Sequence, residues 1–447
     1  MKREGAGHSR RAWRLVGGAL LLALVAYACG TSIYIRPGLS PRCRECIAGD
    51  QELDARVVLI GDAGEPLDQT PNLELLSHIA AADPGRTLVL FLGDNIYPAG
   101  MPALDEGVDL ERRDAEEVLA AQVEAVETAG AAAVFVPGNH DWNRSREGGM
   151  ARVLALRDWL DAHAGERIRL QPRDACPGPI VIEAGRWVRV VVIDTEWLLT
   201  PSQRRRGMQA CARGSETDPE TYSPTDEAAF YRSLEQIVDT TGERYLLVAS
   251  HHPIRTRGEH GGYVPLKYWL FPFTRRIPWL YIPLPLIYPP LRYGIVRSDQ
   301  DLVGGRNREM VRELERIAAT ARSKPVVMAA GHDHNLQVIQ PSGSDVVVLV
   351  SGSGSKVGAV GKNNDTIFRH AQVGLMVVDY FTDGRIALRV YEARGDRSQE
   401  PVFSFWLRSS KGTAAEPTSA TACQAGDRAR CVRSTRGSDR QVQVRAP

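Results

Sequence analysis

Two histidines spaced two residues apart are well placed to bind metal. His332 and His334 follow a short apolar run, residues 325–330, that predicts a buried strand, and Gly331 lets the chain turn as it leaves that strand. On an extended backbone, side chains at positions i and i+2 point to the same side. The spacing therefore predicts two imidazoles that reach one metal ion or two adjacent ions; an exposed polar loop is the alternative.

Metal-type donors also follow four predicted strands further upstream. The runs 55–60, 87–92, 131–136 and 245–250 end, respectively, just before Asp62, Asp94, Asn139 and His251. Helical spacing at 72–82 and 114–128 separates the first three runs, which is typical of parallel α/β architecture. Open sheets of this kind bind ligands at the carboxyl ends of their strands.

The donor types indicate which metals to expect. Carboxylate, amide and imidazole groups together are too hard for a soft thiolate-type site and too rich in nitrogen for calcium. One or two first-row metals fit them, and Asp94 can bridge two ions held roughly 3.5–4 Å apart. Taken singly, each residue also has a structural explanation, as a turn former, a cap or a buried histidine.

Composition narrows the class of protein. Charged residues make up 24% and hydrophobic residues 43% of the 447 residues, and the formal net charge is +1. These values are ordinary for a globular chain with one large α/β domain or two small ones. We expect no nucleic-acid partner, and the arginines at 204–206 are interpreted as a solvated loop. Oligomeric state stays open.

The first 28 residues have the pattern of an export segment. Basic residues precede an apolar run at 15–28, and a small-x-small signal at 26–28 stands directly before Cys29. Cleavage there leaves a secreted protein or a lipoprotein, whereas an uncut segment 15–35 is long enough to span a bilayer. A buried N-terminal helix is the alternative. We expect an exported protein of the cell envelope, membrane-anchored or secreted.

The other six cysteines agree with an oxidising compartment. Proximity in sequence pairs Cys176 with Cys211 and Cys423 with Cys431, although sequence alone does not determine the pairing. The remaining two, in the motif 43–46, lie in a Pro/Arg-rich stretch and not at a helix start. We therefore interpret that motif as structural, with a redox or zinc site as the alternative.

The chain divides into a predicted linker at 29–54, a folded domain at 55–408 and a disordered tail at 409–447. Strands predicted at 346–350, 374–380, 385–391 and 402–406 indicate a second, antiparallel sheet. Residues 263–297 form an insertion rich in Pro, Trp, Tyr, Leu and Ile, too broken by proline to be a transmembrane helix. It is an ordered surface excursion, a membrane-resting lobe, a partner surface or a wall of the substrate pocket.

Five ordered blocks carry a family resemblance: Gly61-Asp62-Ala63-Gly64, Gly93-Asp94-Asn95-Ile96-Tyr97, Gly138-Asn139-His140-Asp141, Val248-x-x-His251 and Gly331-His332-x-His334. They resemble the purple acid phosphatases, a branch of the calcineurin-like metallophosphoesterases, and are most similar to the small tartrate-resistant type. The segment Glu259-His260-Gly261 also looks like that type. The resemblance implies an α/β fold with a two-sheet β sandwich flanked by helices (α/β/β/α).

The resemblance also implies a dinuclear ligand set. One metal would be held by Asp62, Tyr97 and His334, the other by Asn139, His251 and His332, with Asp94 between them. A phenolate from Tyr97 implies Fe(III) with a divalent Fe, Zn or Mn partner; a packing aromatic is the alternative role for Tyr97. His140 would contact the phosphate or the leaving group, and His252 would help it to stabilise charge or protonate the leaving oxygen. As acids that are not metal ligands, His252 and His260 are more weakly supported.

The resulting prediction is a metallophosphoesterase, an acid phosphatase-like hydrolase of phosphate monoesters in which metal-bound hydroxide attacks phosphorus in line. A phosphodiesterase or a membrane phospholipid-head phosphatase is the first alternative. The second is a non-catalytic anchored binding protein on the same scaffold. Contact with a membrane through the N-terminus or through residues 263–297 stays open.

Overall fold

The computed structural model describes residues 33–43, 46, 52–65, 70–201, 226–275, 277–285, 287–394 and 400–409 of the 447. The predicted export segment, Cys29, Cys211, Cys423 and Cys431 lie outside these residues, as does the predicted tail from residue 410 onwards.

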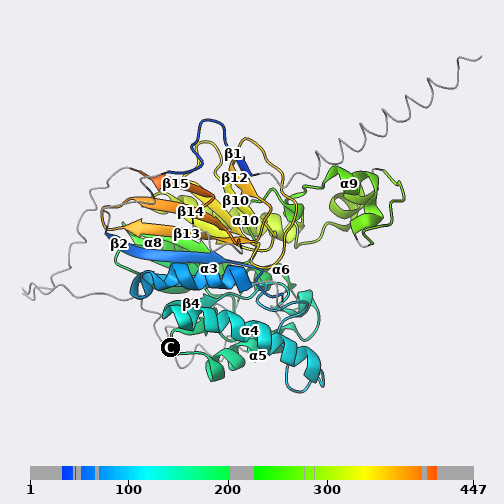
Figure 1. Cartoon of the computed structure of the whole chain (residues 1–447), viewed down its shortest axis with the longest axis horizontal. Coiled ribbons are helices and arrows are strands. Elements are labelled where there is room, and N and C mark those ends of the chain that lie inside the picture. Colours follow the sequence, from blue (N-terminus) through cyan, green and yellow to red (C-terminus); the bar gives the residue numbers. More distant parts are fainter. Residues whose placement is uncertain are drawn as a thin grey trace, which may run out of the picture.

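Two mixed sheets form the centre of the molecule (Figure 1). The first contains, in spatial order, β1 (Tyr34–Ile35), β12 (Thr366–His370), β10 (Leu336–Ile339), β11 (Val346–Ser351), β9 (Val326–Ala330), β8 (Tyr245–Ala249), β7 (Val188–Val192) and β6 (Ile180–Ala184). The second contains β15 (Phe403–Arg408), β14 (Ile386–Glu392), β13 (Gly374–Phe381), β2 (Leu53–Ile60), β3 (Thr87–Phe91), β4 (Ala132–Phe135) and β5 (Ile168–Leu170).

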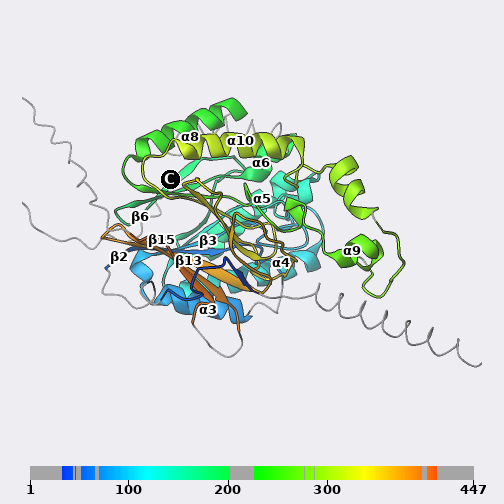
Figure 2. The same ribbon diagram turned by 90° about the horizontal axis from the view of Figure 1, so that it is seen from above.

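Helices cover the outer face of each sheet. α8 (Glu227–Thr241) and α10 (Gly305–Ala319) lie over the first sheet with the short α6 (Thr195–Leu199) (Figure 2). The second sheet is covered by α3 (Thr70–Ala81), α4 (Asp109–Ala129) and α5 (Gly149–His163) (Figure 1). The four layers confirm the predicted sandwich flanked by helices.

The apolar pattern of β2 explains why the layers form. Val57 and Leu59 are buried between the two sheets, while Val58 and Ile60 are buried in the layer beneath the helices. Successive strand residues point to opposite faces, so a strand covered on both faces needs an unbroken apolar run. The same run predicts the strand from the sequence.

The prediction of a separate antiparallel C-terminal sheet is wrong. β13 pairs antiparallel with β2, and β14 and β15 extend the same sheet, whereas β11 pairs parallel with β9 in the other sheet. The hairpin β13–β14 is a local feature of the sequence. Its partner β2 lies more than three hundred residues earlier, and a local pattern carries no information about such a pairing.

Part of the segment predicted as a linker packs on the sandwich. Tyr34–Ile35 pairs with β12, and Cys43 and Cys46 form a disulfide beside Phe381 and Trp406. The structural interpretation of the cysteine motif is thereby confirmed. Cys176 is also disulfide-bonded; Cys211, its predicted partner, lies outside the described residues.

The insertion at 263–297 forms a lobe beside the sandwich (Figures 1 and 2). It contains α9 (Leu266–Leu270), the 3-10 helix η5 (Pro272–Arg275) and the π-helical turn η6 (Pro290–Val296). Within the described ranges, every helix is too short or too polar to cross a bilayer.

Candidate metal centre

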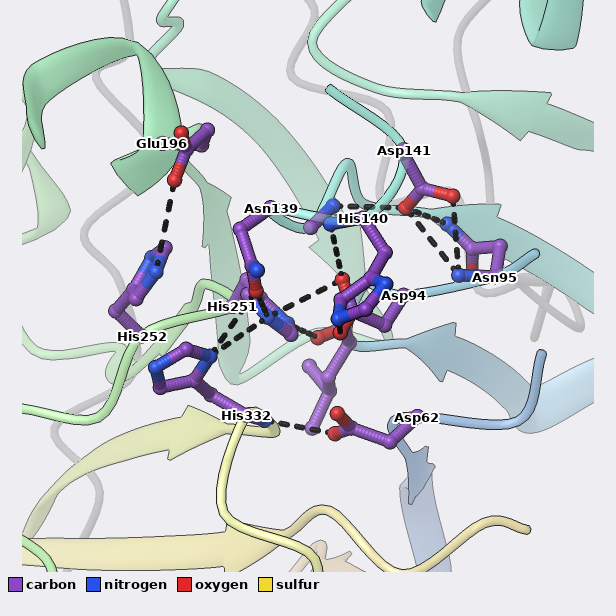
Figure 3. Close-up of polar contacts among 12 residues, drawn as sticks. Asp62, Asp94, Asn95, Asn139, His140, Asp141, Glu196, His251, His252 and His332 are labelled. Atoms are coloured by element: carbon purple, nitrogen blue, oxygen red, sulfur yellow. Dashed lines mark hydrogen bonds and ion pairs between the residues drawn. The ribbon is translucent and has the colours of Figure 1, made fainter. Parts of the chain in front are cut away.

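The predicted donors converge at one edge of the sandwich, from both sheets (Figure 3). Loops after β2, β3 and β4 of the second sheet carry Asp62, Asp94, Tyr97, Asn139 and His140. Loops after β8 and β9 of the first sheet carry His251, His252, His332 and His334. Because parallel strands of both sheets end at this edge, residues far apart in the chain are brought together.

Asp62, Tyr97 and His334 form the first cluster. The Tyr97 hydroxyl lies 3.0 Å from Asp62 Oδ1 and 3.2 Å from His334 Nε2, and that nitrogen lies 3.4 Å from the same carboxylate oxygen. Phenol, carboxylate and imidazole therefore present one donor atom each to a common point.

Asn139, His251 and His332 form the second cluster. Asn139 Oδ1 lies 2.9 Å from His251 Nε2 and 3.1 Å from His332 Nδ1, and the two nitrogens are 3.1 Å apart. The three residues are the set that the family resemblance implies for a second metal.

Asp94 lies between the clusters. Its Oδ1 is 3.4 Å from His251 Nε2. The Asp94 carboxylate, the Asp62 carboxylate and the His251 imidazole each offer one donor atom, and these three atoms lie within 4.8 Å of one another. The backbone N–H of His140 donates to Asp94 Oδ1 at 2.8 Å, which holds the carboxylate in this position. The arrangement suits a carboxylate that contacts both metals.

Backbone carbonyls orient the two imidazoles of the second cluster. His251 Nδ1 donates to the Leu92 carbonyl at 2.9 Å, and His332 Nε2 donates to the Gln300 carbonyl at 3.0 Å. Each ring therefore turns its other nitrogen, Nε2 of His251 and Nδ1 of His332, toward Asn139. Outer hydrogen bonds of this kind are the usual way in which proteins orient metal-binding histidines.

Three of these residues adopt strained backbone conformations. Asp62 has φ 58°, Asp94 φ 53° and His332 φ 69°, in the left-handed region that costs a non-glycine residue about 1–2 kcal/mol. The turn after β9 is thus made at His332 and not at Gly331. At Gly331 a Cβ would lie 2.5 Å from Asp62 Oδ2, so glycine serves close approach there.

The extended backbone predicted across the histidine pair is correspondingly wrong. Residues 332–335 form a bend, and His332 joins the second cluster while His334 joins the first. The bend places the two imidazoles in two adjacent clusters, which corresponds to the second of the two predicted arrangements.

The electrostatics of the edge favour bound cations. Burial alone would raise the pKa of Asp94, but the imidazoles of His251 and His140 outweigh it and lower that pKa to about 2. Burial, with the His260 and His252 imidazoles, lowers the pKa of His332 well below its usual value, so the ring stays neutral. An ionised carboxylate at Asp94 and a neutral imidazole at His332 are the protonation states that metal binding requires.

The surroundings of Tyr97 keep its phenol protonated. Burial, with the carboxylates of Asp62 and Asp94, raises the pKa of its phenol well above the usual value. The phenol keeps its proton and donates it to Asp62 unless a strongly charged ion compensates the phenolate. Together with the buried carboxylates, this donor set fits two metal ions.

His140 stands beside the donors without being one of them. Its Nδ1 donates to the Pro98 carbonyl at 2.6 Å, its Nε2 lies 3.8 Å from Asp94 Oδ2, and its ring meets Tyr97 edge-on. Burial lowers its pKa despite the opposing charge of Asp94. A neutral imidazole so placed can contact a ligand of the metals.

Both ring nitrogens of His252 are already engaged. Nδ1 lies 2.9 Å from Thr195 Oγ1, and Nε2 lies 2.7 Å from Gln300 Oε1. The ring is fully buried and packs on His332 with centroids 4.3 Å apart. This geometry favours support of the second cluster; proton transfer by His252 stays a prediction.

Sequence reasoning missed two supporting groups. Gln300 Nε2 donates to Glu196 Oε2 at 2.9 Å, so one glutamine links a buried carboxylate, His252 and His332. Asp141 accepts from the backbone N–H groups of Asn95 and Gly138 and thereby joins two ligand loops. Asp141 could have been noticed in its motif, whereas Gln300 lies just after the insertion with no motif around it.

Comparison with known proteins agrees with the fold. Residues 55–277 match the family model described as calcineurin-like phosphoesterase. Among solved structures, GAP50, the anchor in the inner membrane complex of Plasmodium, is 15% identical with a TM-score of 0.50, covering 81% of this chain and 91% of its own. At that identity the likeness supports the fold alone.

Two further structures have lower TM-scores and carry no argument. Purple acid phosphatase PPD1 from yellow lupin (Lupinus luteus) is 12% identical, with a TM-score of 0.44 and coverage of 80% of this chain and 54% of its own. The 5'-nucleotidase precursor from Thermus thermophilus is 15% identical, with a TM-score of 0.33 and coverage of 73% and 51%. No curated protein matches the chain.

The match to the family model over residues 55–277 shows that the chain carries a calcineurin-like phosphoesterase domain.

Proposed function

We propose that the protein is an exported hydrolase of phosphate monoesters of the purple acid phosphatase type, with Fe(III) and a divalent Fe, Zn or Mn ion. The observation that carries the proposal is the position of the Tyr97 hydroxyl, 3.0 Å from Asp62 Oδ1 and 3.2 Å from His334 Nε2. A phenolate is a hard anionic donor, and it favours a trivalent iron over a divalent ion.

The predicted ligands fall into two sets, one for each metal ion of the proposed reaction. Asp62, Tyr97 and His334 would hold one ion and Asn139, His251 and His332 the other, with Asp94 shared. When bound, the two ions would polarise the phosphate ester and supply an acidified water for in-line attack.

His140 is the group of this chain assigned to the substrate. Its Nδ1–H bond to the Pro98 carbonyl fixes the ring, so that Nε2 faces Asp94 and the space over the donors. From there the ring can bind a phosphoryl oxygen or pass a proton to the leaving oxygen.

Hydrolysis assays on the metal-loaded protein test the proposal. A soluble phosphate monoester, a phosphodiester and a vesicle-borne lipid phosphate are compared for the parent chain, for Asp94→Asn and for the exposed helix residue Asp109→Asn. We expect the parent to hydrolyse the monoester. Turnover should fall at least about 10²-fold in Asp94→Asn and stay unchanged in Asp109→Asn. A metal-loaded parent that cleaves none of the three would contradict the proposal.

A lipid-head phosphatase or a phosphodiesterase is the first alternative. The lobe at 263–297 favours the lipid substrate, because the segment directly before the lobe adjoins the candidate metal centre. In that segment, the ring of His260 packs on His332 with centroids 3.8 Å apart. Faster turnover of the vesicle-borne lipid than of the soluble monoester would select this alternative.

A non-catalytic anchored binding protein is the second alternative. The fold is shared with GAP50, which is described as an anchor in a membrane complex. A protein that binds metal and is silent on all three substrates would select it.

A further inference from the structure

Most of the exposed large apolar side chains among the described residues belong to the lobe, residues 263–297. Within the described residues, twelve of the seventeen exposed large hydrophobic side chains lie between Tyr263 and Val296. Trp279 is 76% exposed and Ile295 is 75% exposed, and Tyr281, Ile282 and Ile287 are exposed with them. So many exposed apolar side chains in one short segment usually mark a surface that a partner or a membrane covers.

The charge of the lobe indicates which kind of partner would bind its apolar surface. Its 35 residues contain five basic residues, Lys267, Arg275, Arg276, Arg292 and Arg297, and no Asp or Glu. The Lys267 ammonium lies 5.4 Å from the Tyr281 ring centroid, and exposed Arg297 donates to the Gly294 carbonyl. Neither cation has a carboxylate partner among the described residues, so both are available to an anionic surface.

Tryptophan and tyrosine amid aliphatic side chains and cations form a characteristic combination. Trp and Tyr concentrate at the boundary between headgroups and acyl chains, where one end of the ring is apolar and the other is hydrated. Lys and Arg extend their stems along apolar surface and reach phosphate with their charged ends. Binding to another protein does not require a surface of purely positive charge, whereas binding to an anionic bilayer is strengthened by one.

Ion pairs and hydrogen bonds hold the root of the lobe, the part that contacts Glu259 and Asp301, to the body of the protein. Arg275 and Arg292 pair with Glu259, Tyr293 Oη donates to the Glu259 carbonyl at 2.8 Å, and Arg292 donates to Asp301 at 2.8 Å. Two of the five cations are therefore used inside the protein. These contacts attach both η5 and η6 to the body of the protein.

We propose that the lobe rests in the interface of a membrane rich in anionic lipid, with Trp279, Tyr281 and Ile282 at the boundary between headgroups and acyl chains and with Lys267 and Arg297 at the lipid phosphates. The apolar side chains supply the burial, and the unpaired cations select anionic over neutral lipid. Since the root reaches His332 through Asp301 and His260, the metal centre is held at a fixed place relative to the bilayer.

Quenching of tryptophan fluorescence by lipids brominated in their acyl chains tests this on the full chain, without metal or substrate. Vesicles of phosphatidylcholine alone are compared with vesicles that also contain phosphatidylglycerol. The Trp279→Phe variant reports on the lobe, and Trp187→Phe, in the sandwich, is the matched control. Any contribution of Trp13, in the export segment, is common to all variants and cancels in the difference.

We expect stronger quenching with phosphatidylglycerol, loss of most of the lobe's share in Trp279→Phe and no loss in Trp187→Phe. The double variant Lys267→Gln/Arg297→Gln should lose the preference for phosphatidylglycerol. Equal quenching of the parent and Trp279→Phe would overturn the proposal, as would burial of Trp279 between two copies of the chain in solution. Either result is independent of whether the protein hydrolyses phosphate esters.

Discussion

Backbone strain and ligand chemistry coincide at single residues. Asp62, Asp94 and His332 all have positive φ, and all three lie within the predicted donor set. Each costs about 1–2 kcal/mol, which the surrounding sandwich must outweigh. Strain of this kind aims a short side chain off the end of a strand, back across the sheet edge, and a relaxed turn would point it elsewhere.

Gly93→Ala is expected to disable the centre. Gly93 has φ +87°, and a Cβ there would lie 2.5 Å from His251 Nδ1, the nitrogen that orients the ring through Leu92. The displaced imidazole should lower turnover by about 10²-fold, since a shift of roughly 1 Å has that effect on an aligned site. Steady-state kinetics and metal content on the purified variant measure it.

Gly107→Ala is the matched control. Gly107 also has a positive φ, +69°, yet nothing lies within 4 Å of its added Cβ. It should lose only about 1–2 kcal/mol of unfolding free energy and keep its turnover. Equal activity losses in the two variants would assign the effect to strain and contradict the role given to His251.

Strands and helices can be predicted from the sequence where a local pattern of apolar residues determines them. Buried parallel strands such as Thr87–Phe91 appear as continuous apolar runs, and the polar residue after each run belongs to the centre. The short strands Ile168–Leu170 and Thr366–His370 carry no such run and escape prediction. The role of Gln300 depends on where the insertion returns to the body, which only tertiary structure shows.

Gln300→Ala is expected to weaken the second cluster while leaving its ligands in place. The backbone carbonyl that holds His332 remains, but the amide that joins His252 to Glu196 is lost. Loss of such outer contacts typically lowers metal affinity 10–100-fold. Metal titration should show about tenfold weaker binding of one ion; the exposed Gln236→Ala is the control, and unchanged affinity would contradict the link.

The cap of α6 predicts a pH-dependent stability. Burial raises the pKa of Asp194 to about 7, although its oxygens accept from the Trp197 N–H and the Trp142 indole. The folded protein therefore keeps a proton that the unfolded chain loses near pH 4. This contribution is fully present below about pH 4 and is lost as the pH rises toward about 7.

Urea unfolding across that range checks the prediction. Asp194→Asn carries no ionisable group, so its unfolding free energy should fall less steeply between about pH 4 and pH 7 than that of the parent. Parallel curves for the two proteins would contradict the raised pKa.

For the whole molecule, the two sheets meet at the candidate metal centre. Asp62, Asp94 and Asn139 follow strands of one sheet, whereas His251 and His332 follow strands of the other. Ions bound there would join the two sheets, and binding to the folded state alone adds about 2.7 kcal/mol at a hundredfold excess over Kd.

Removal of metal should therefore lower the Tm of the parent protein, and metal addition should restore it. Asp94→Asn is the comparison, because asparagine tolerates the left-handed backbone while the shared charge is lost. We expect a clearly smaller Tm shift in that variant by calorimetry. Equal Tm values with and without metal in the parent would contradict a centre built from both sheets.

If Tyr97 binds iron as a phenolate in a two-metal site, the visible spectrum of the oxidised, iron-loaded protein will report it. We expect a phenolate-to-iron charge-transfer band in the parent, its absence in Tyr97→Phe, and about two metal ions per parent chain. An iron-loaded, oxidised parent without the band, or a Tyr97→Phe variant that retains it, would contradict the assignment of Tyr97.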